Sequence, residues 1–202
     1  MNMKQILFNT EMVRVIMEGR KTVTRRVVKP QPPATSVVRK RSCAWEWSFW
    51  ADCDMGHLMQ PPCQPGDILW VRETWCKADG HYMYRAFPGI GMEPEKQDAA
   101  MREMGLKWRP SIHMPREAAR LFLRVTDVRV ERLQDINLDP PGPKNQVVRE
   151  GLRYLSDFIA VWDRTIKPAD LHLYGWEANP WVWVIEFERI SKDKALGGGM
   201  DD

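Results

Sequence analysis

The segment from Gly19 to Arg26 concentrates the side chains of this chain that could do chemistry. It reads Gly-Arg-Lys-Thr-Val-Thr-Arg-Arg and therefore places four cations and two hydroxyls within eight residues. Such a cluster can bind an anion or a polar ligand through charge and hydrogen bonds. The same residues are also typical of a basic surface turn whose lysine and arginines are only solvated, and the segment alone leaves both interpretations open.

The residues around this cluster predict a helix followed by an extended segment. Apolar side chains recur at helical spacing between residues 12 and 17, and Gly19 is a natural stop at the C-terminal end of that helix. The residues after Lys21 favour an extended chain, in which alternate side chains face the same way, although Lys21 lies at the junction, where the alternation need not hold. One face would carry Thr22, Thr24 and Arg26, and the other Lys21, Val23 and Arg25.

The composition is that of an ordinary globular domain. A length of 202 residues, with 44% hydrophobic and 28% charged residues, allows one domain with insertions to bury a core. The sequence has neither a run of about 18 apolar residues nor a signal-peptide pattern, so we expect a cytoplasmic protein without a membrane partner. The net charge of +3 does not by itself indicate nucleic-acid binding, although 30 lysines and arginines provide material for a local basic patch.

The cysteines indicate whether the chain binds a metal, and the tryptophans whether it could stack on bases. Cys43, Cys53, Cys63 and Cys76 match neither a paired zinc motif nor a secreted disulfide framework, so we expect reduced thiols, no metal and no cofactor. The 10 tryptophans are many for this length and serve either as core bulk or as stacking platforms for bases. Those expected in the core are Trp70, Trp162, Trp181 and Trp183.

Proline-rich stretches delimit two candidate insertions. Residues 29–33 break regular structure and open an irregular insertion to about residue 64, in which an aromatic run alternates as in a short strand or hairpin. A buried strand is then predicted over residues 67–75, and its charged end makes Arg72 and Glu73 candidate site residues. The second insertion extends over about residues 76–110. It contains a predicted strand at 82–84 and a helix at 95–104.

A loop fixed by Pro110 and Pro115 presents Arg109, Ser111 and His113. Polar side chains on a loop of fixed shape are candidates for the wall of a binding site. Alternatively, Arg109 makes a structural ion pair and His113 bonds to a backbone carbonyl. The sequence leaves these two interpretations open.

The C-terminal half predicts further strands and a broken helix. A helical turn at 116–120 precedes a strand at 121–133, and helical spacing from 147 to 162 is interrupted by Gly151. A strand is predicted at 181–190, and residues 191–202 are expected to form a flexible tail. Strands outnumber helices and do not alternate with them. This pattern favours an α+β fold, a small β-barrel decorated by helices, over a doubly wound sheet.

Five segments, in this order, resemble the ASCH domain, and more closely the ASCH proteins encoded by phages and prophages. They are residues 18–26 (Glu-Gly-Arg-Lys-Thr-Val-Thr-Arg-Arg), 65–73, 126–131, the pair Glu150-Gly151, and 179–187. The ordered set covers roughly residues 4 to 190 and is more specific than any one segment. The resemblance implies a single PUA-like β-barrel domain over residues 1–190, a fold class associated with RNA recognition, with insertions at about 29–64 and 76–110.

One branch of ASCH proteins, the small bacterial N(4)-acetylcytidine amidohydrolases, is similar in using a lysine, a threonine three residues later and a distant glutamate. The matching positions are Lys21, Thr24 and Glu150. A lysine near other cations has a lowered pKa and can act as a base, and Thr24 would then be the nucleophile. Glu150, kept protonated by burial, would protonate the leaving amine, and His113 or Arg109 would hold the developing oxyanion.

The resemblance therefore implies recognition of RNA or a modified nucleoside in a basic cleft, with hydrolysis of an acylated base as the most concrete reaction. One alternative is a non-catalytic RNA-binding or regulatory module, in which the basic residues 39–41 and the aromatic residues 45–50 hold phosphates and stacked bases. Another is a ribonuclease that uses the same lysine as acid or base. The residues expected to bind substrate or nucleic acid are Arg20, Thr22, Arg25, Arg26, Arg72, Glu73, Arg109, Ser111 and His113.

Overall fold

A computed structural model of the chain describes residues 3–33, 37–40, 47–50, 57–86, 94–136, 138 and 145–197. The chain forms two compact units. The first comprises Met1–Gly19, Asp67–Arg124 and Glu188–Asp202, and the second comprises Arg20–Gly66 and Val125–Phe187. The interpretation of residues 1–190 as one domain stays a prediction.

The first unit is built around a parallel pair of strands. In it β1 (Met3–Leu7) runs parallel to β6 (Ile68–Arg72), and β6 pairs antiparallel with the first residues of β9 (Phe122–Arg132). Its core contains Phe122 together with Ile68, Trp75 and Met114. The other elements are α1 (Thr10–Met17), β7 (Trp75–Ala78), β8 (His81–Tyr84), α2 (Pro94–Glu103), α6 (Lys192–Ala195) and the 3-10 turns Ser111–His113 and Arg116–Ala118.

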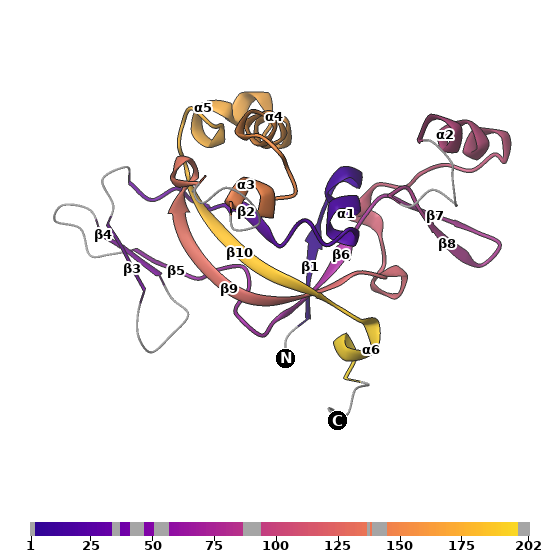
Figure 1. Ribbon diagram of the computed structural model, residues 1–202, viewed down its shortest axis with the longest axis horizontal. Coiled ribbons are helices and arrows are strands. Elements are labelled where there is room, and N and C mark those ends of the chain that lie inside the picture. Colours follow the sequence, from indigo (N-terminus) through magenta and orange to yellow (C-terminus); the bar gives the residue numbers. More distant parts are fainter. Residues whose placement is uncertain are drawn as a thin grey trace. The chain divides into compact units, whose positions relative to one another are not determined.

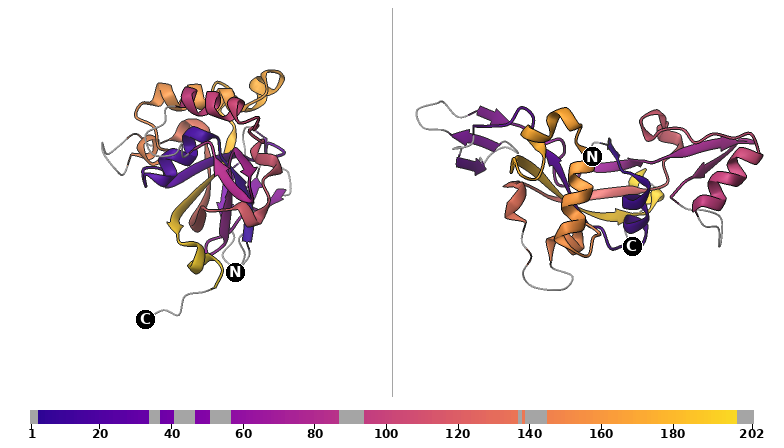
Figure 2. Two further views of the ribbon diagram at one scale, coloured as in Figure 1. Left: turned by 90° about the vertical axis from the view of Figure 1, so that its right-hand side faces the viewer. Right: turned by 90° about the horizontal axis from the view of Figure 1, so that it is seen from above.

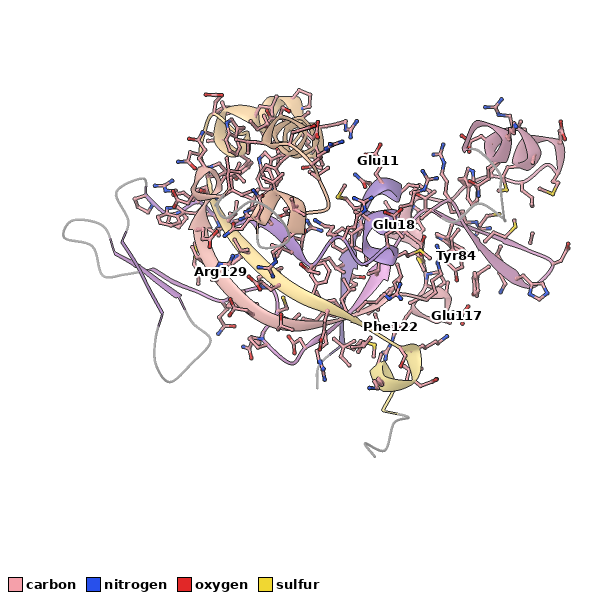
Figure 3. All side chains as sticks on the ribbon, viewed as in Figure 1. Glu11, Glu18, Tyr84, Glu117, Phe122 and Arg129 are labelled. Atoms are coloured by element: carbon pink, nitrogen blue, oxygen red, sulfur yellow. The ribbon has the colours of Figure 1, made fainter. Side chains whose placement is uncertain are left out.

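The hairpin of β7 and β8 lies next to α2 in two views (Figure 1, Figure 2). An ion pair of 2.6 Å between Arg85 and Asp98 joins the end of the hairpin to the helix. The hydroxyl of Tyr84, labelled in Figure 3, donates to the backbone oxygen of Ala118 at 2.6 Å. The ion pair therefore joins two parts of the segment predicted as the second insertion, and the hydrogen bond from Tyr84 attaches that segment to the turn Arg116–Ala118.

Strands β9 and β10 (Trp181–Ile190) continue from the first unit into the second. There β10 pairs antiparallel with β2 (Val23–Val27), so that Val184 lies opposite Arg25. A separate antiparallel sheet in the second unit contains β3 (Val37–Lys40), β4 (Trp47–Trp50) and β5 (His57–Met59). The helices of this unit are α3 (Gln146–Arg149), α4 (Leu155–Thr165) and α5 (Leu171–Tyr174), with 3-10 turns at Leu133–Asp135 and Pro168–Asp170.

Helices α3, α4 and α5 lie on the same side of the β2 and β10 pair (Figure 1). Helix α4 contributes Phe158 and Trp162 to the core of the second unit, with ring centroids 6.2 Å apart. The strands contribute Val23, Val182 and Val184, which have no exposed surface. Burying a large apolar side chain stabilises a fold by about 1.5 to 3 kcal/mol, so these contacts fix α4 over the strands.

The long strands are the elements that sequence periodicity predicted best. Strand β10 has the predicted bounds 181–190, and β9 begins and ends one residue inside the predicted range 121–133. The helix predicted at 95–104 is confirmed as α2. Helix α6 lies within the segment expected to be a flexible tail, and its Ala195 is buried in the core of the first unit.

The strand predicted over residues 67–75 is divided into β6 and β7. At the break the backbone hydrogen bonds no longer go to a neighbouring strand of the sheet. The N–H of Glu73 donates to Met114 Sδ at 3.2 Å. The N–H of Trp75 then donates to the backbone oxygen of Arg109 at 3.2 Å. The prediction of one continuous strand was wrong because an apolar pattern does not reveal a change of hydrogen-bonding partner.

The fold is of the mixed α+β class. The described strands form open sheets, and no closed barrel is found among them. The interruption predicted at Gly151 is confirmed as the break between α3 and α4. In the part of the chain that the structure describes, no helix has the length and apolar character needed to cross a membrane.

An ion pair between a partly exposed arginine and a buried carboxylate in the first unit gives a test of this packing. Arg120 donates two hydrogen bonds of 2.9 Å to the carboxylate of Glu73, which is 1% exposed. We expect Arg120→Ala to lower the free energy of unfolding by about 3 to 5 kcal/mol, because the buried carboxylate loses its partner. Arg124→Ala, which removes an exposed pair with Glu188, should change it by about 0 to 1 kcal/mol. Urea denaturation measures both, and equal effects would contradict the structure.

Candidate functional site

Lys21 and Glu150 form a buried ion pair in the second unit. Lys21 Nζ lies 2.5 Å from Glu150 Oε2 and donates a further hydrogen bond of 3.0 Å to the backbone oxygen of Glu150. Only 2% and 5% of the two side chains are exposed. The residues are 129 positions apart, so only the folded chain brings them together. The contact joins two of the three side chains predicted to be catalytic.

Backbone hydrogen bonds fix the two segments that carry this pair. Lys21 and Glu150 form an antiparallel bridge, and the N–H of Thr22 donates to the backbone oxygen of Arg149 at 2.8 Å. The N–H of Phe187 donates to the backbone oxygen of Thr22 at 2.9 Å, which attaches the same segment to β10. The pair therefore lies on a rigid support rather than on a free loop.

The end of α3 explains why cations gather at this point. The last carbonyls of a helix carry partial negative charge and require donors. Arg20 Nη1 donates to the backbone oxygen of Gly151 at 3.1 Å, beside the bond from Lys21 to Glu150. Gly151 has a φ of +87°, a left-handed conformation that favours glycine at a helix end. The interpretation of the basic cluster as a merely solvated turn is wrong for Lys21 and Arg25, which are both buried.

Arg25 holds the second carboxylate oxygen of Glu150. Its Nη1 donates to Glu150 Oε1 at 2.9 Å, while Lys21 occupies Oε2. The Nη2 of Arg25 donates to Gln146 Oε1 and lies 3.4 Å from Glu131 Oε2. Lys21 and Arg25 thus meet the same carboxylate, as expected for residues on one face of the extended segment.

Thr24 and Arg26 also contact each other, as alternation along β2 predicted. Arg26 Nη1 donates to Thr24 Oγ1 at 2.9 Å and to the backbone oxygen of Arg25 at 3.0 Å. Thr24 is 2% exposed and Arg26 is half-buried. The predicted nucleophile is therefore held by a cation of the predicted binding set.

Burial dominates the electrostatics of the site. It lowers the pKa of Lys21 below its ordinary value, against the opposing attraction of Glu150, and the charges of Arg26 and Arg25 lower it further. Burial also lowers the pKa of Arg26, although Glu150 and Cys63 oppose that shift. These mutual effects show that the guanidinium of Arg26 lies within electrostatic reach of both Lys21 and Glu150.

A partly exposed network of ion pairs adjoins the buried group. Arg129, labelled in Figure 3, bonds to Glu131 and lies 2.5 Å from Glu186 Oε1. Arg149 bonds to both oxygens of Glu186, at 3.1 and 2.6 Å, and its Nε donates to Thr22 Oγ1 at 3.3 Å. Glu131 connects this network to Arg25.

Sequence reasoning missed the residues of this network, although two signals were present. Alternation along β9 places Arg129 and Glu131 on one face of the strand. Gln146, the partner of Arg25 that was also missed, lies four residues before Glu150 and so on the same face of a helical turn. No local pattern indicated Glu186, whose partners come from β9 and α3.

Three of the remaining predicted binding residues, Arg72, Glu73 and Arg109, belong to the first unit. Arg72 donates to Gln5 Oε1 at 2.7 Å and also to the backbone oxygen of Ile112, whereas Glu73 is held by Arg120. The guanidinium of Arg109 lies 5.2 Å from the centroid of the Trp75 ring.

Ser111 and His113 also lie in the first unit, in the first of its 3-10 turns. Ser111 is half-buried and His113 is exposed. The N–H of His113 donates to the backbone oxygen of Pro110 at 3.1 Å, which closes the turn. A binding role for either side chain stays a prediction.

The described residues contain no group of three or more His, Cys, Asp or Glu side chains that could hold a metal ion. Cys63 and Cys76 are buried, while Cys43 and Cys53 lie outside the described residues. The side chains of residues 39–41 and 45–50, expected to hold phosphates and bases, also lie outside the described part.

Comparisons of the chain with protein-family models, curated proteins and solved structures give no match. The resemblance to the ASCH domain therefore rests on the five sequence segments. What the site can do follows from its own geometry and charges.

The network around Glu186 predicts a pH dependence of stability. Burial disfavours the charged form of Glu186, but the hydrogen bonds and charges of Arg149 and Arg129 outweigh it and hold the pKa below its ordinary value of 4.5. The stabilisation is therefore complete above that value and is lost as the pH falls through the lower pKa of the folded state.

We expect Glu186→Gln to reduce the loss of unfolding free energy between pH 7 and about pH 3, measured by urea denaturation at each pH. Glu188→Gln is the matched control, because Glu188 forms an exposed pair with Arg124. A pH dependence in the Glu186 variant as steep as in the unmodified protein would contradict the role of this carboxylate.

Proposed function

We propose that the second unit is an ASCH-type, PUA-like amidohydrolase that removes the acyl group from an N-acylated nucleoside base, with N(4)-acetylcytidine as the most concrete substrate. The observation that carries the proposal is the buried pair of Lys21 and Glu150, 2.5 Å apart, together with Arg26, whose charge acts on Lys21 and whose guanidinium bonds to the hydroxyl of Thr24. A base, an acid, a hydroxyl nucleophile and a cation are the groups that acyl transfer requires.

Lys21 is the base in this proposal. A lysine with an ordinary pKa is protonated at neutral pH and cannot accept a proton, so a general base requires a lowered pKa. Burial and the neighbouring charges of Arg26 and Arg25 lower the pKa of Lys21. Arginine at this position would bind Glu150 equally well but would not exchange its proton.

Glu150 is the acid. Movement of one proton from Lys21 Nζ to Glu150 Oε2 along their hydrogen bond converts the ion pair into a neutral amine and a carboxylic acid, without a change of total charge. The pair can therefore supply a base and an acid at once. Arg25 keeps the carboxyl group oriented through Oε1.

Thr24 is the nucleophile. Its hydroxyl proton passes to Lys21 Nζ as Oγ1 bonds to the acyl carbon, and the carbonyl electron pair moves onto the oxygen. Collapse of this intermediate breaks the bond between the acyl carbon and the amide nitrogen. The amino group of the nucleobase, which leaves, takes the proton of Glu150. Water then hydrolyses the ester on Thr24, which releases the carboxylic acid and restores the hydroxyl, with Lys21 and Glu150 again charged.

The direct test is incubation of the purified protein with N(4)-acetylcytidine, followed by absorbance as cytidine forms. We expect Lys21→Ala to lower kcat/KM by about a hundredfold to ten-thousandfold, the usual contribution of a general base. Lys29→Ala removes an exposed lysine of the same unit that contacts the Tyr174 ring, and it should leave kcat/KM unchanged. Thr24→Ser should retain turnover that Thr24→Val loses.

Circular dichroism of each variant separates lost chemistry from lost folding. Turnover by a folded Lys21→Ala protein at the unmodified rate would refute the role of Lys21. No turnover by the unmodified protein would reject this substrate and favour the alternatives of an RNA-binding module or a ribonuclease. An RNA affinity that Lys21→Ala weakens in a salt-dependent way would then indicate an electrostatic role for Lys21.

The reactive form of the pair carries one proton, which predicts a bell-shaped dependence of kcat/KM on pH. The rate should fall in acid, where the pair takes up a second proton, and in alkali, where it loses its one proton. Because the pKa of Lys21 is lowered, the alkaline limb should have an apparent pKa below 10.5. Initial rates between pH 5 and pH 11 provide the measurement, and a rate that rises continuously to pH 11 would indicate attack by hydroxide instead.

A further inference from the structure

Arg25 has one donor that the buried group does not use. Its Nη1 and Nη2 bond to Glu150, Gln146 and Glu131, but its buried Nε–H has no acceptor among the described residues. Arg25 itself is 3% exposed, so this donor has no access to bulk water. A buried donor without an acceptor is unfavourable by about 1 to 3 kcal/mol, and such a donor at a site is a reason to look for a ligand.

The charges around this donor favour an anionic acceptor. The buried side chains of the second unit include two cations, Lys21 and Arg25, and one carboxylate, Glu150, among the described residues. Among the partly exposed side chains, Arg26 adds a third positive charge within electrostatic reach, and Glu131, 3.4 Å from Arg25, adds a second negative charge, so positive charges still outnumber negative ones by one among these five groups. An excess of positive charge in a region of low dielectric constant stabilises a negative charge that enters it or develops within it.

The neighbourhood of Arg25 is also apolar on one side. The guanidinium carbon lies 5.9 Å from the centroid of the Phe158 ring, which belongs to the core of the second unit. A short acyl chain, such as a methyl group, can pack against a ring of this kind while its oxygen faces the guanidinium. The surroundings therefore suit a small acyl group better than a phosphate.

We infer that the Nε–H of Arg25 donates to the acyl oxygen of the substrate, and that the same position holds the small carboxylate released by hydrolysis. This inference rests on the proposed function of the same site. It assigns to Arg25 the oxyanion role expected of His113 or Arg109, two residues of the first unit. Because Nε is enclosed, a neighbouring side chain must move before the acyl oxygen reaches it.

Binding of acetate to the full-length protein tests the inference without turnover. In protein labelled with nitrogen-15, the Nε–H resonance of Arg25 should shift and saturate as sodium acetate is added. Sodium chloride at equal ionic strength should not produce the saturable shift, and acetamide, whose oxygen is neutral like that of the substrate, should produce it only at a higher concentration than acetate. Acetate should also raise the Tm, because it binds only the folded state.

Two arginine variants provide the matched comparison. Arg25→Lys keeps the positive charge but removes Nε–H, and we expect the Kd for acetate to rise by at least about tenfold, the equivalent of one charge-assisted hydrogen bond. Arg124→Lys makes the same replacement in an exposed pair, where the Arg124 Nε–H donates to Glu188, and should change the Kd by less than about twofold.

The outcomes separate this inference from the proposed function. Acetate binding that depends on Arg25, without hydrolysis of N(4)-acetylcytidine, supports the acyl subsite and rejects that reaction. Hydrolysis without acetate binding, or equal binding by Arg25→Lys, overturns the inference and leaves the reaction standing. If Arg25→Lys does not fold, the resonance of the unmodified protein decides alone, since the absence of a saturable shift at Nε–H overturns the assignment.

Discussion

The burial of Lys21 with Glu150 is the constraint that the surrounding parts of the second unit satisfy. A buried charge is tolerated only when a partner and further hydrogen bonds compensate its loss of water. Glu150 uses one carboxylate oxygen for Lys21 and the other for Arg25, and Arg25 is held in turn by Gln146 and Glu131. Loss of one member leaves its partners buried without compensation, which lowers the free energy of unfolding by about 3 to 5 kcal/mol. Electrostatics therefore link β2, α3 and β9 in addition to apolar packing.

Two buried carboxylates in this chain have different cations as partners, and this difference indicates that the pair at Lys21 does more than stabilise the fold. Glu73 is held by Arg120 through two parallel hydrogen bonds, a geometry that matches the planar guanidinium. A guanidinium does not exchange its proton in proteins, so this arginine can serve as a hydrogen-bond donor but not as a base. Glu150 faces a lysine instead, whose burial lowers its pKa and makes proton exchange accessible. A structural role alone gives no reason to prefer the titratable partner.

Local patterns in the sequence predicted the strands and the strand face on which each site residue lies. They did not predict the distant residues that these side chains contact. Period-two alternation identified β9 and β10 almost to the residue, and the same rule placed Lys21 with Arg25 and Thr24 with Arg26. The contact of Lys21 with Glu150 spans 129 positions, and it was expected only because five segments resemble the ASCH domain. No spacing rule reports contacts made by tertiary folding, so Glu186 and the break between β6 and β7 were missed.

Lys21 interacts with side chains from both faces of β2, and the proposed mechanism depends on this position. Strand alternation alone would keep Thr24 and Arg26 away from the face that carries Arg25. Lys21 lies before the first residue of β2, in the bridge to Glu150, and the charge of Arg26 lowers its pKa more than the charge of Arg25 does. Arg26 is therefore close enough to act on Lys21 while it holds the hydroxyl of Thr24. A ligand that displaces Arg26 from Thr24 would free the hydroxyl. Burial, the largest cause of the lowered pKa of Lys21, would still act on the lysine at that moment.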